Sequence, residues 1–265
     1  MRAGNRSHDQ IRTLKTTFDI FPNAQGSVLF ECGNTKILCA VTVQPGVPPF
    51  MRGSGSGWLN AEYALLPAAT KPRNAREITQ MRRNKRSTEI SRLIGRSLRT
   101  VCDLSALGER TIIVDCDVLQ ADGGTRVASI CAASIALQRA QHALFVNKEL
   151  SRPFLTSTIA AVSVGIQDGI VLLDPDYQED CSMEADFNVV MTTSGNLIEM
   201  QGGAEKEPVS WDVFDEVRAV AHKGIEQLNT FFNATTDAAI AKSNESRADK
   251  KPLFSLKSRL EQLKK

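Results

Sequence analysis

The chain has 265 residues, which is enough to bury the core of one large domain or of two small ones. Its 32 Lys and Arg residues nearly balance its 30 Asp and Glu residues, so net charge alone does not indicate a nucleic-acid partner. Six cysteines without C-x-x-C spacing and three scattered histidines argue against a zinc site and fit a reducing compartment.

The first half of the chain is predicted to form strands and then a helix. An arginine-rich N-terminus is expected to be loosely ordered. A hairpin follows over 26–43, and a further strand over 58–66. Residues 67–86 lack apolar periodicity and predict a surface loop, whereas the apolar spacing over 89–101 predicts a helix.

The second half repeats the pattern of strands followed by a helix. An apolar strand over 111–119 runs into paired glycines, and a long apolar helix follows to about residue 146. A hairpin is predicted over 159–173 and alternating strands over 184–201. A last core helix is expected over 210–228, with Ser210 as its N-cap.

This order of elements indicates an α+β fold, with mixed sheets and helices packed in two lobes that share a core. We assign residues 1–235 to the folded domain, with a phosphate-binding lobe over about 1–150 and a second lobe over 151–235. Residues 236–265 are polar and then basic, which predicts a disordered tail. No signal peptide opens the chain and no apolar run has membrane-spanning length, so we expect a cytoplasmic protein.

The paired glycines are the first candidate for a functional site. A strand that turns through Gly123-Gly124 into a helix start leaves backbone N–H groups without partners, and these groups and the helix dipole attract an anion. Thr125 adds a hydroxyl group and Arg126 a planar guanidinium suited to phosphate. A plain tight turn, with Arg126 in solvent, is an equally simple interpretation of this motif alone.

A basic segment precedes the first predicted helix. Its basic residues are Lys71, Arg73, Arg76, Arg82, Arg83, Lys85, Arg86, Arg92, Arg96 and Arg99, and its only acidic residues are Glu77 and Glu89. Such a local field favours a polyanionic partner, although a solvated loop and helix face would show the same composition. Arg86 lies just before the helix start, where its guanidinium and the helix dipole could bind one anion together.

Two pairs of carboxylates complete the candidates. Asp180 in a polar loop and Asp186 on the polar face of a strand could together hold Mg²⁺, or either could protonate a leaving alkoxide. An acidic surface loop is the alternative interpretation of their spacing. Asp115 and Asp117 also share a strand face, and we expect basic side chains to pair with them in a structural role.

Six segments then occur in a fixed order. They are Ala24-x-Gly26-Ser27-Val28, Gly57-Trp58-x-x-Ala61-Glu62-Tyr63, Arg73-Asn74-Ala75-Arg76-Glu77, the run from Asp115 to Arg126, the run from Ala160 to Gly165, and Glu184-x-Asp186-x-Asn188-Val189-Val190-Met191. With these segments the chain resembles the RNase PH family, the phosphate-dependent exoribonucleases that trim bacterial tRNA. The likeness runs almost without gaps from Arg2 to about Leu228. Each segment alone would be weak, whereas together they are specific.

The resemblance implies the RNase PH fold (ribosomal protein S5 domain 2-like) and attack by inorganic phosphate on the last phosphodiester of an RNA 3′ end. The products are a nucleoside diphosphate and a shortened chain, in a nearly reversible step. It assigns phosphate binding to Arg86, Gly124, Thr125 and Arg126, catalysis and Mg²⁺ binding to Asp180 and Asp186, and RNA binding to Arg73 and Arg76. It further implies a homohexamer, a trimer of dimers, that acts on the 3′ ends of tRNA precursors.

Two departures from the family pattern leave alternatives open. Ala68 stands where the family usually has an arginine, which removes a phosphate contact that Lys71, Arg82 or Arg83 could replace. The tail beyond Asn233 is also unusual for the family. A non-catalytic RNA-binding ring subunit of exosome type and a hydrolytic nuclease are the competing hypotheses, and retention of the phosphate-site arginines and of both aspartates argues against the ring subunit.

Overall fold

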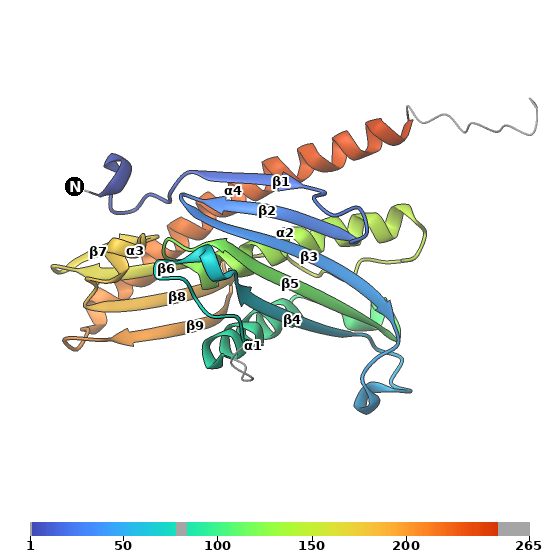
Figure 1. Ribbon diagram of the computed structural model, residues 1–265, viewed down its shortest axis with the longest axis horizontal. Helices are drawn as coiled ribbons and strands as arrows, with labels where there is room; N and C mark the ends of the chain where they lie inside the picture. Colours follow the sequence, from blue (N-terminus) through green and yellow to red (C-terminus); the bar gives the residue numbers. More distant parts are fainter. Residues whose placement is uncertain (1, 78–83, 249–265) are drawn as a thin grey trace, which may run out of the picture.

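Two sheets enclose a central helix in the computed structural model, which describes residues 2–77 and 84–248. The first sheet has five strands in the spatial order β1-β2-β3-β5-β4 (Figure 1). These strands are β1 (Leu14–Phe18), β2 (Gly26–Cys32), β3 (Thr35–Pro45), β4 (Trp58–Leu65) and β5 (Arg110–Gln120). Neighbours in the sheet are antiparallel except β4 and β5, which are parallel, so a helical crossover must connect these two strands.

The second sheet is antiparallel and has the order β7-β6-β8-β9. Its strands are β6 (Ile159–Gln167), β7 (Ile170–Leu173), β8 (Ala185–Thr192) and β9 (Leu197–Ala204). A short helix, α3 (Tyr177–Asp180), joins β7 to β8. Along β8 the buried Ala185, Phe187 and Val189 alternate with more exposed polar residues, as the period-two pattern predicts.

Helix α2 (Thr125–Val146) packs against β2 and β3 of the first sheet and against β6 of the second. Because both sheets cover it, the helix is apolar on most of its circumference, and its many alanines let the strands approach closely. Helix α1 (Lys85–Arg99) forms the crossover and covers β4, while α4 (Trp211–Ala248) packs on β6 and β7. One continuous hydrophobic core therefore serves both sheets, and it confirms the predicted α+β fold with a shared core.

The N-terminus differs from its prediction, because it is ordered by ion pairs. Arg2 and Arg6 contact Glu179, and Arg12 forms a buried pair with Asp174 before β1 begins. The acidic partners lie more than 160 residues away along the chain, so no local pattern around the arginines predicts them.

The predicted disordered tail is wrong over its first part. Helix α4 continues without a break from Trp211 to Ala248, past the expected end of the folded domain. Phe232 and Thr236 are buried, and the ring of Phe232 lies 5.8 Å from that of Phe30 on β2, so packing on the core extends the helix. The predicted tail residues 249–265 lie outside the described part of the chain. Within the described ranges, no helix is both long enough and apolar enough to cross a bilayer.

Candidate active site

The glycine pair forms the turn between β5 and α2. Gly123 has φ 75° and Gly124 has φ 64°, in the left-handed region that favours glycine. A Cβ atom on Gly123 would also lie 2.7 Å from the carbonyl oxygen of Pro175, so this position admits no side chain. Gly124 is the N-cap residue of α2 and provides no side-chain cap. The first N–H groups of α2 are therefore available to an anion, as the sequence predicts.

Thr125 begins α2 and is buried beside Tyr63 of β4. Its hydroxyl group lies 3.0 Å from the Tyr63 hydroxyl. Burial raises the pKa of Tyr63, and the positive charges of Arg86 and Arg126 act in the opposite direction. Both arginines predicted to bind phosphate are thus within electrostatic range of the same pair of hydroxyl groups, at the N-terminus of α2.

Arg126 is held in place by two acceptors from other elements. Its Nη1 donates to Oε1 of Gln201 on β9 at 2.7 Å, and its Nη2 donates to Oε2 of Glu89 on α1 at 3.0 Å. The interpretation that leaves this guanidinium free in solvent is therefore wrong. Three elements meet at Arg126, and its position next to Gly124 and Thr125 brings a fixed positive charge to the open end of α2.

Arg86 lies in the first turn of α1 and is exposed. Its backbone N–H donates to Oδ1 of the N-cap residue Asn84 at 2.9 Å, so the start of the helix fixes its backbone. A cavity of about 380 Å³ is lined by residues of β4, by Arg76 and by Arg86.

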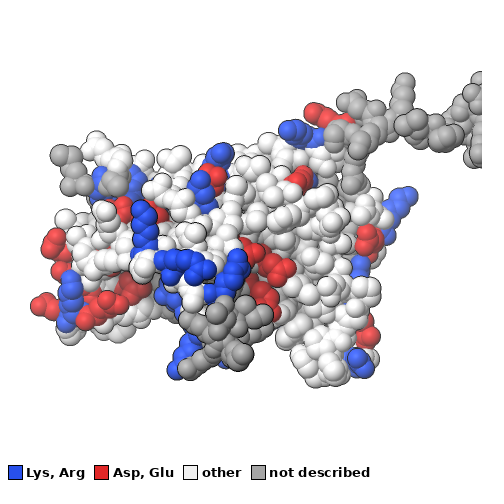
Figure 2. Space-filling view, viewed as in Figure 1, with Lys and Arg blue, Asp and Glu red and all other residues white. Residues whose placement is uncertain are grey.

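Arg73 and Arg76 are exposed in the segment that joins β4 to α1, where Figure 2 shows several basic side chains beside the residues drawn in grey. Ala68 is also exposed, in the short helix η3 (Pro67–Ala69) of this segment. Arg82 and Arg83, which could replace the missing arginine, lie outside the described residues.

Asp180 is the last residue of α3 and is exposed, with its carboxyl group only partly buried. Asp176 caps the helix with bonds of 3.0 Å from the N–H groups of Gln178 and Glu179. Burial of its carboxyl group and the negative charge of Asp186 raise the pKa of Asp180, whereas Arg86 acts in the opposite direction. The structure thus brings together Asp180, Asp186 and Arg86, which are far apart along the chain.

The two aspartates fit a magnesium ion by the chemistry of their donor groups. Mg²⁺ is commonly bound by one or two carboxylates, with waters and substrate phosphates completing its shell. The described residues contain no cluster of three or more His, Cys, Asp or Glu side chains suited to a metal, so Asp180 and Asp186 would be its only carboxylate ligands from this part of the chain. The two carboxylates repel each other, and a bound cation would offset this repulsion.

Among the described residues, Asp115 and Asp117 do not have the basic partners that the sequence predicts. Both lie on the face of β5 away from α2, in register with Glu62 and Ala64 of the neighbouring β4. Burial and the charges of Asp117 and Glu62 raise the pKa of Asp115, and burial raises that of Asp117. Figure 2 shows the resulting acidic patch over β4 and β5. No basic side chain of the described residues forms an ion pair with either aspartate, because the strands beside β5 carry none at the facing positions.

Other residues of the site were not predicted at all. Glu89 and Gln201 accept hydrogen bonds from Arg126. Arg12, which pairs with Asp174, donates a hydrogen bond to the carbonyl group of Asp122 next to the glycine turn. The sequence places Glu89 only in the first turn of a helix and leaves Arg12 in a loose N-terminus. Contacts between residues that lie far apart in the sequence become apparent only in the folded structure.

An α+β fold in which a helix N-terminus opens between arginines and a carboxylate pair defines a class of protein that binds phosphate groups. The chain belongs to the 3′ exoribonuclease family: the model of domain 1 of that family matches residues 10–143, and the model of domain 2 matches residues 157–224.

The curated relatives carry the same assignment. Ribonuclease PH of Neisseria meningitidis serogroup C is 49% identical over 224 residues, which cover 84% of this chain and 93% of that protein. Ribonuclease PH of Neisseria gonorrhoeae is 48% identical with the same coverage.

Solved structures share the fold at lower identity. The Archaeoglobus fulgidus exosome with RNA bound to the active site is similar with a TM-score of 0.74 and 23% identity, over 87% of this chain and 92% of that one. Rice Rrp46 is similar with a TM-score of 0.71 and 20% identity, over 89% of this chain and 100% of that one.

Proposed function

We propose that this protein is a phosphorolytic 3′→5′ exoribonuclease that trims the 3′ ends of tRNA precursors in the cytoplasm. Inorganic phosphate is the nucleophile and nucleoside diphosphates are the products. The observation that carries the proposal is the position of Arg86, whose charge acts both on Tyr63, beside Thr125 at the N-terminus of α2, and on Asp180, beside Asp186. Membership of the 3′ exoribonuclease family supports the same reaction.

The first task of the site is to hold phosphate for attack. Backbone N–H groups at Gly124 and Thr125 and the guanidinium groups of Arg86 and Arg126 supply donors for its oxygens. Fixing the ion in line with the terminal phosphodiester converts a bimolecular encounter into a positioned reaction. The same positive groups reduce repulsion between the attacking phosphate and the RNA.

The second task is departure of the 3′ oxygen. A phosphate oxygen forms a bond to the terminal phosphorus, and the bond from that phosphorus to the 3′ oxygen of the preceding nucleotide breaks. The leaving oxygen must gain a proton, which Asp180 or Asp186 would donate if it is protonated. If both carboxylates are ionised instead, they would hold Mg²⁺, which would offset negative charge on the phosphates. Since a phosphodiester is exchanged for a phosphoanhydride, the same site should also add nucleotides from diphosphates.

RNA binding is assigned to the exposed Arg73 and Arg76, which contact phosphates without reading sequence. A homohexamer, a trimer of dimers, would present one such segment per subunit and add weak contacts through multivalency. An archaeal exosome core and an archaeal exosome with bound RNA share this fold, which supports a ring assembly for the chain. Ala68 removes one phosphate contact from each copy.

The test is to incubate short RNA with the protein, with and without orthophosphate, and to identify the nucleotide released. Nucleoside diphosphate that forms only with phosphate supports the proposal. Monophosphate formed without phosphate would indicate a hydrolytic nuclease. Binding of RNA with no release under either condition would indicate a non-catalytic ring subunit of exosome type.

A further inference from the structure

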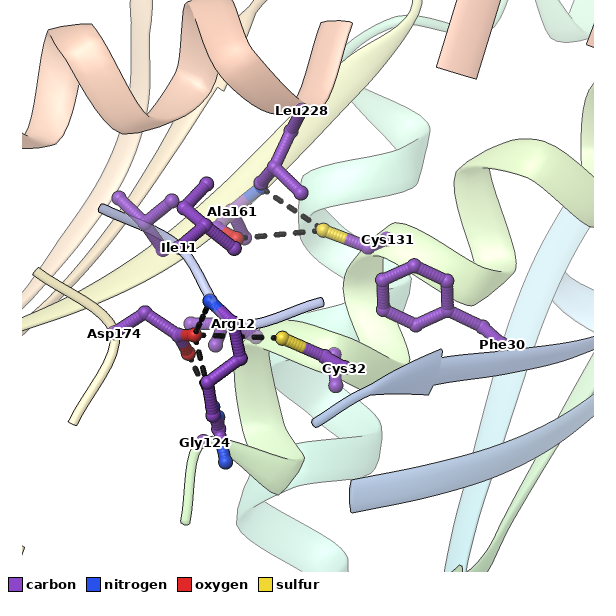
Figure 3. A pocket seen from close by; sticks show the side chains of 12 residues that line it. Ile11, Arg12, Phe30, Cys32, Gly124, Cys131, Ala161, Asp174 and Leu228 are labelled. Atoms are coloured by element: carbon purple, nitrogen blue, oxygen red, sulfur yellow. Dashed lines mark hydrogen bonds and ion pairs between the residues drawn. The ribbon is translucent and has the colours of Figure 1, made fainter. Parts of the chain in front are cut away.

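We propose that Arg12 is a positioning residue, which acts through its buried pair with Asp174 to set the direction of the N–H groups that receive phosphate. The inference rests on the proposed function and extends it to a residue outside the phosphate contacts. Figure 3 shows the Arg12 side chain beside Asp174, with its far end next to Gly124.

The pair with Asp174 anchors Arg12. Both residues are buried, with Arg12 7% and Asp174 5% exposed. The Nη2 and Nε atoms of Arg12 donate to Oδ1 and Oδ2 of Asp174 at 2.7 and 2.8 Å, and the backbone N–H of Arg12 donates to Oδ2 at 2.9 Å. Burial would raise the pKa of Asp174, but Arg12 holds it below its usual range, so the carboxylate keeps its charge.

The other side of the guanidinium holds the turn. Nη1 donates to the carbonyl oxygen of Asp122, and Nη2 lies 3.5 Å from that of Gly123. The hydroxyl group of Thr35 also donates to the Gly123 carbonyl at 2.7 Å. In a trans peptide the C=O and the following N–H point in opposite directions. Because both carbonyls are held inward, the N–H groups of Gly123 and Gly124 point outward, toward the open end of α2.

The same pair ties the turn to the carboxylate side of the site. Asp174 begins the short segment that leads from β7 into α3, and the backbone N–H of Tyr177 donates to Oδ1 of Asp122 at 3.4 Å. The positive charge of Arg12 is also among those that oppose the rise in the pKa of Asp180. One buried guanidinium therefore fixes the phosphate turn and the start of α3 relative to each other.

A purely structural role would not require this residue. Replacing a buried ion pair by apolar groups of similar volume is often neutral or stabilising, so stability alone is a weak reason for its presence. The planar guanidinium can hold a carboxylate and two carbonyls at once, whereas a lysine ammonium cannot reach all of them. Arg12→Lys therefore keeps the charge and removes the geometry.

The chain offers a matched control in Arg139. This arginine is 5% exposed on α2 and contacts the carboxylate of Asp19 at 2.7 and 3.3 Å, but it does not touch the glycine turn. Arg139→Lys makes the same chemical change to a buried arginine on α2, although the Asp19 side chain that it contacts is 59% exposed. It measures what lost packing and lost hydrogen bonds do to the protein without moving the phosphate turn.

The experiment compares the full-length wild type, Arg12→Lys and Arg139→Lys. It measures KM for phosphate and kcat at saturating RNA, Tm, and binding of orthophosphate to the RNA-free protein by calorimetry. We expect Arg12→Lys to raise the KM and Kd for phosphate about tenfold, the value of one well-placed hydrogen-bonding set. Arg139→Lys should lower Tm by about as much as Arg12→Lys does, but it should leave the KM for phosphate within about twofold of the wild-type value.

Unchanged phosphate affinity in Arg12→Lys, or an equal loss in Arg139→Lys, would overturn the inference. If Arg12→Lys does not fold, Asp174→Asn tests the same link, because it keeps the shape and removes the charge that holds the guanidinium. It should weaken phosphate binding in the same direction, and wild-type affinity would count against the inference. If the wild type releases no diphosphate with phosphate present, the proposed function fails, and the calorimetric comparison still decides the role of Arg12.

Discussion

Two pairs of aspartates, Asp115 with Asp117 and Asp180 with Asp186, each contain a carboxyl group with a raised pKa, but the charges around the two pairs differ. Burial raises the pKa of Asp115 and of Asp180, and in each case a neighbouring aspartate raises it further. Around Asp115 the other charged neighbour is the acidic Glu62. Around Asp180 the positive charges of Arg86 and Arg12 oppose the shift.

The difference shows which property identifies a site for phosphate chemistry. A perturbed pKa marks both pairs, although only Asp180 has cations among the groups that act on it. The acidic patch on β4 and β5 would repel a phosphate, whereas Arg86 and Arg12 near Asp180 would attract one. Cations near a carboxyl group with a raised pKa, rather than the raised pKa alone, therefore distinguish the candidate site from the acidic patch.

The largest expected effect on the rate comes from removing an arginine at the candidate site. Arg126→Ala should lower phosphorolysis at limiting phosphate by roughly 10²–10³-fold, because a fixed positive donor for the developing charge is lost. The oligomeric state measured by light scattering should stay the same, since Arg126 packs within one subunit against Glu89 and Gln201. Unchanged turnover at low phosphate would remove Arg126 from the site.

Direct substitution of the two pairs tests the comparison itself. Asp186→Asn should lower kcat by about 100-fold, in the range of lost acid–base or charge assistance. Asp115→Asn, the matched change on β5, should leave kcat within about twofold. Single-turnover release of diphosphate measures both, and equal losses in the two variants would erase the distinction between the pairs.

Substitutions in the two pairs should change the stability of the protein in the same direction, although they should change its activity differently. A carboxyl whose folded pKa is raised stabilises the protein only in acid, and that contribution is lost as pH rises through its pKa. Asp180→Asn and Asp115→Asn should therefore both raise Tm at pH 7, on the order of 1–2 °C. The gain should shrink toward pH 3, below the ordinary carboxyl pKa of about 4. A lower Tm at pH 7 would contradict the direction of either shift.

The smallest effect is expected far from both pairs. Deleting residues 240–265 removes the end of α4 beyond Thr236, its last buried residue within the described chain, and should change the rate on short RNA by less than about twofold. A large drop would show that this end of the chain takes part in binding RNA.

The sequence by itself determined the elements and the phosphate turn. Local periods predicted the long strands and helices from 26 to 228, because alternation and helical spacing are properties of neighbouring residues, but they missed the short helix α3, which the sequence placed in a polar loop. The glycine pair and Thr125-Arg126 indicated an anion site for the same reason: the strand, turn and helix start are contiguous in the chain.

Only the tertiary structure decided which groups support that turn. Arg12 meets Asp174 across 162 positions, and Arg126 meets Gln201 across 75, so no pattern in the chain announces either contact. In the described part of the chain, the disorder predicted over 236–248 and the basic partners predicted for Asp115 and Asp117 are both absent for a related reason, because burial and partners depend on which elements the fold brings together. A charge's neighbours in space, which set its energy, follow from packing rather than from its neighbours in sequence.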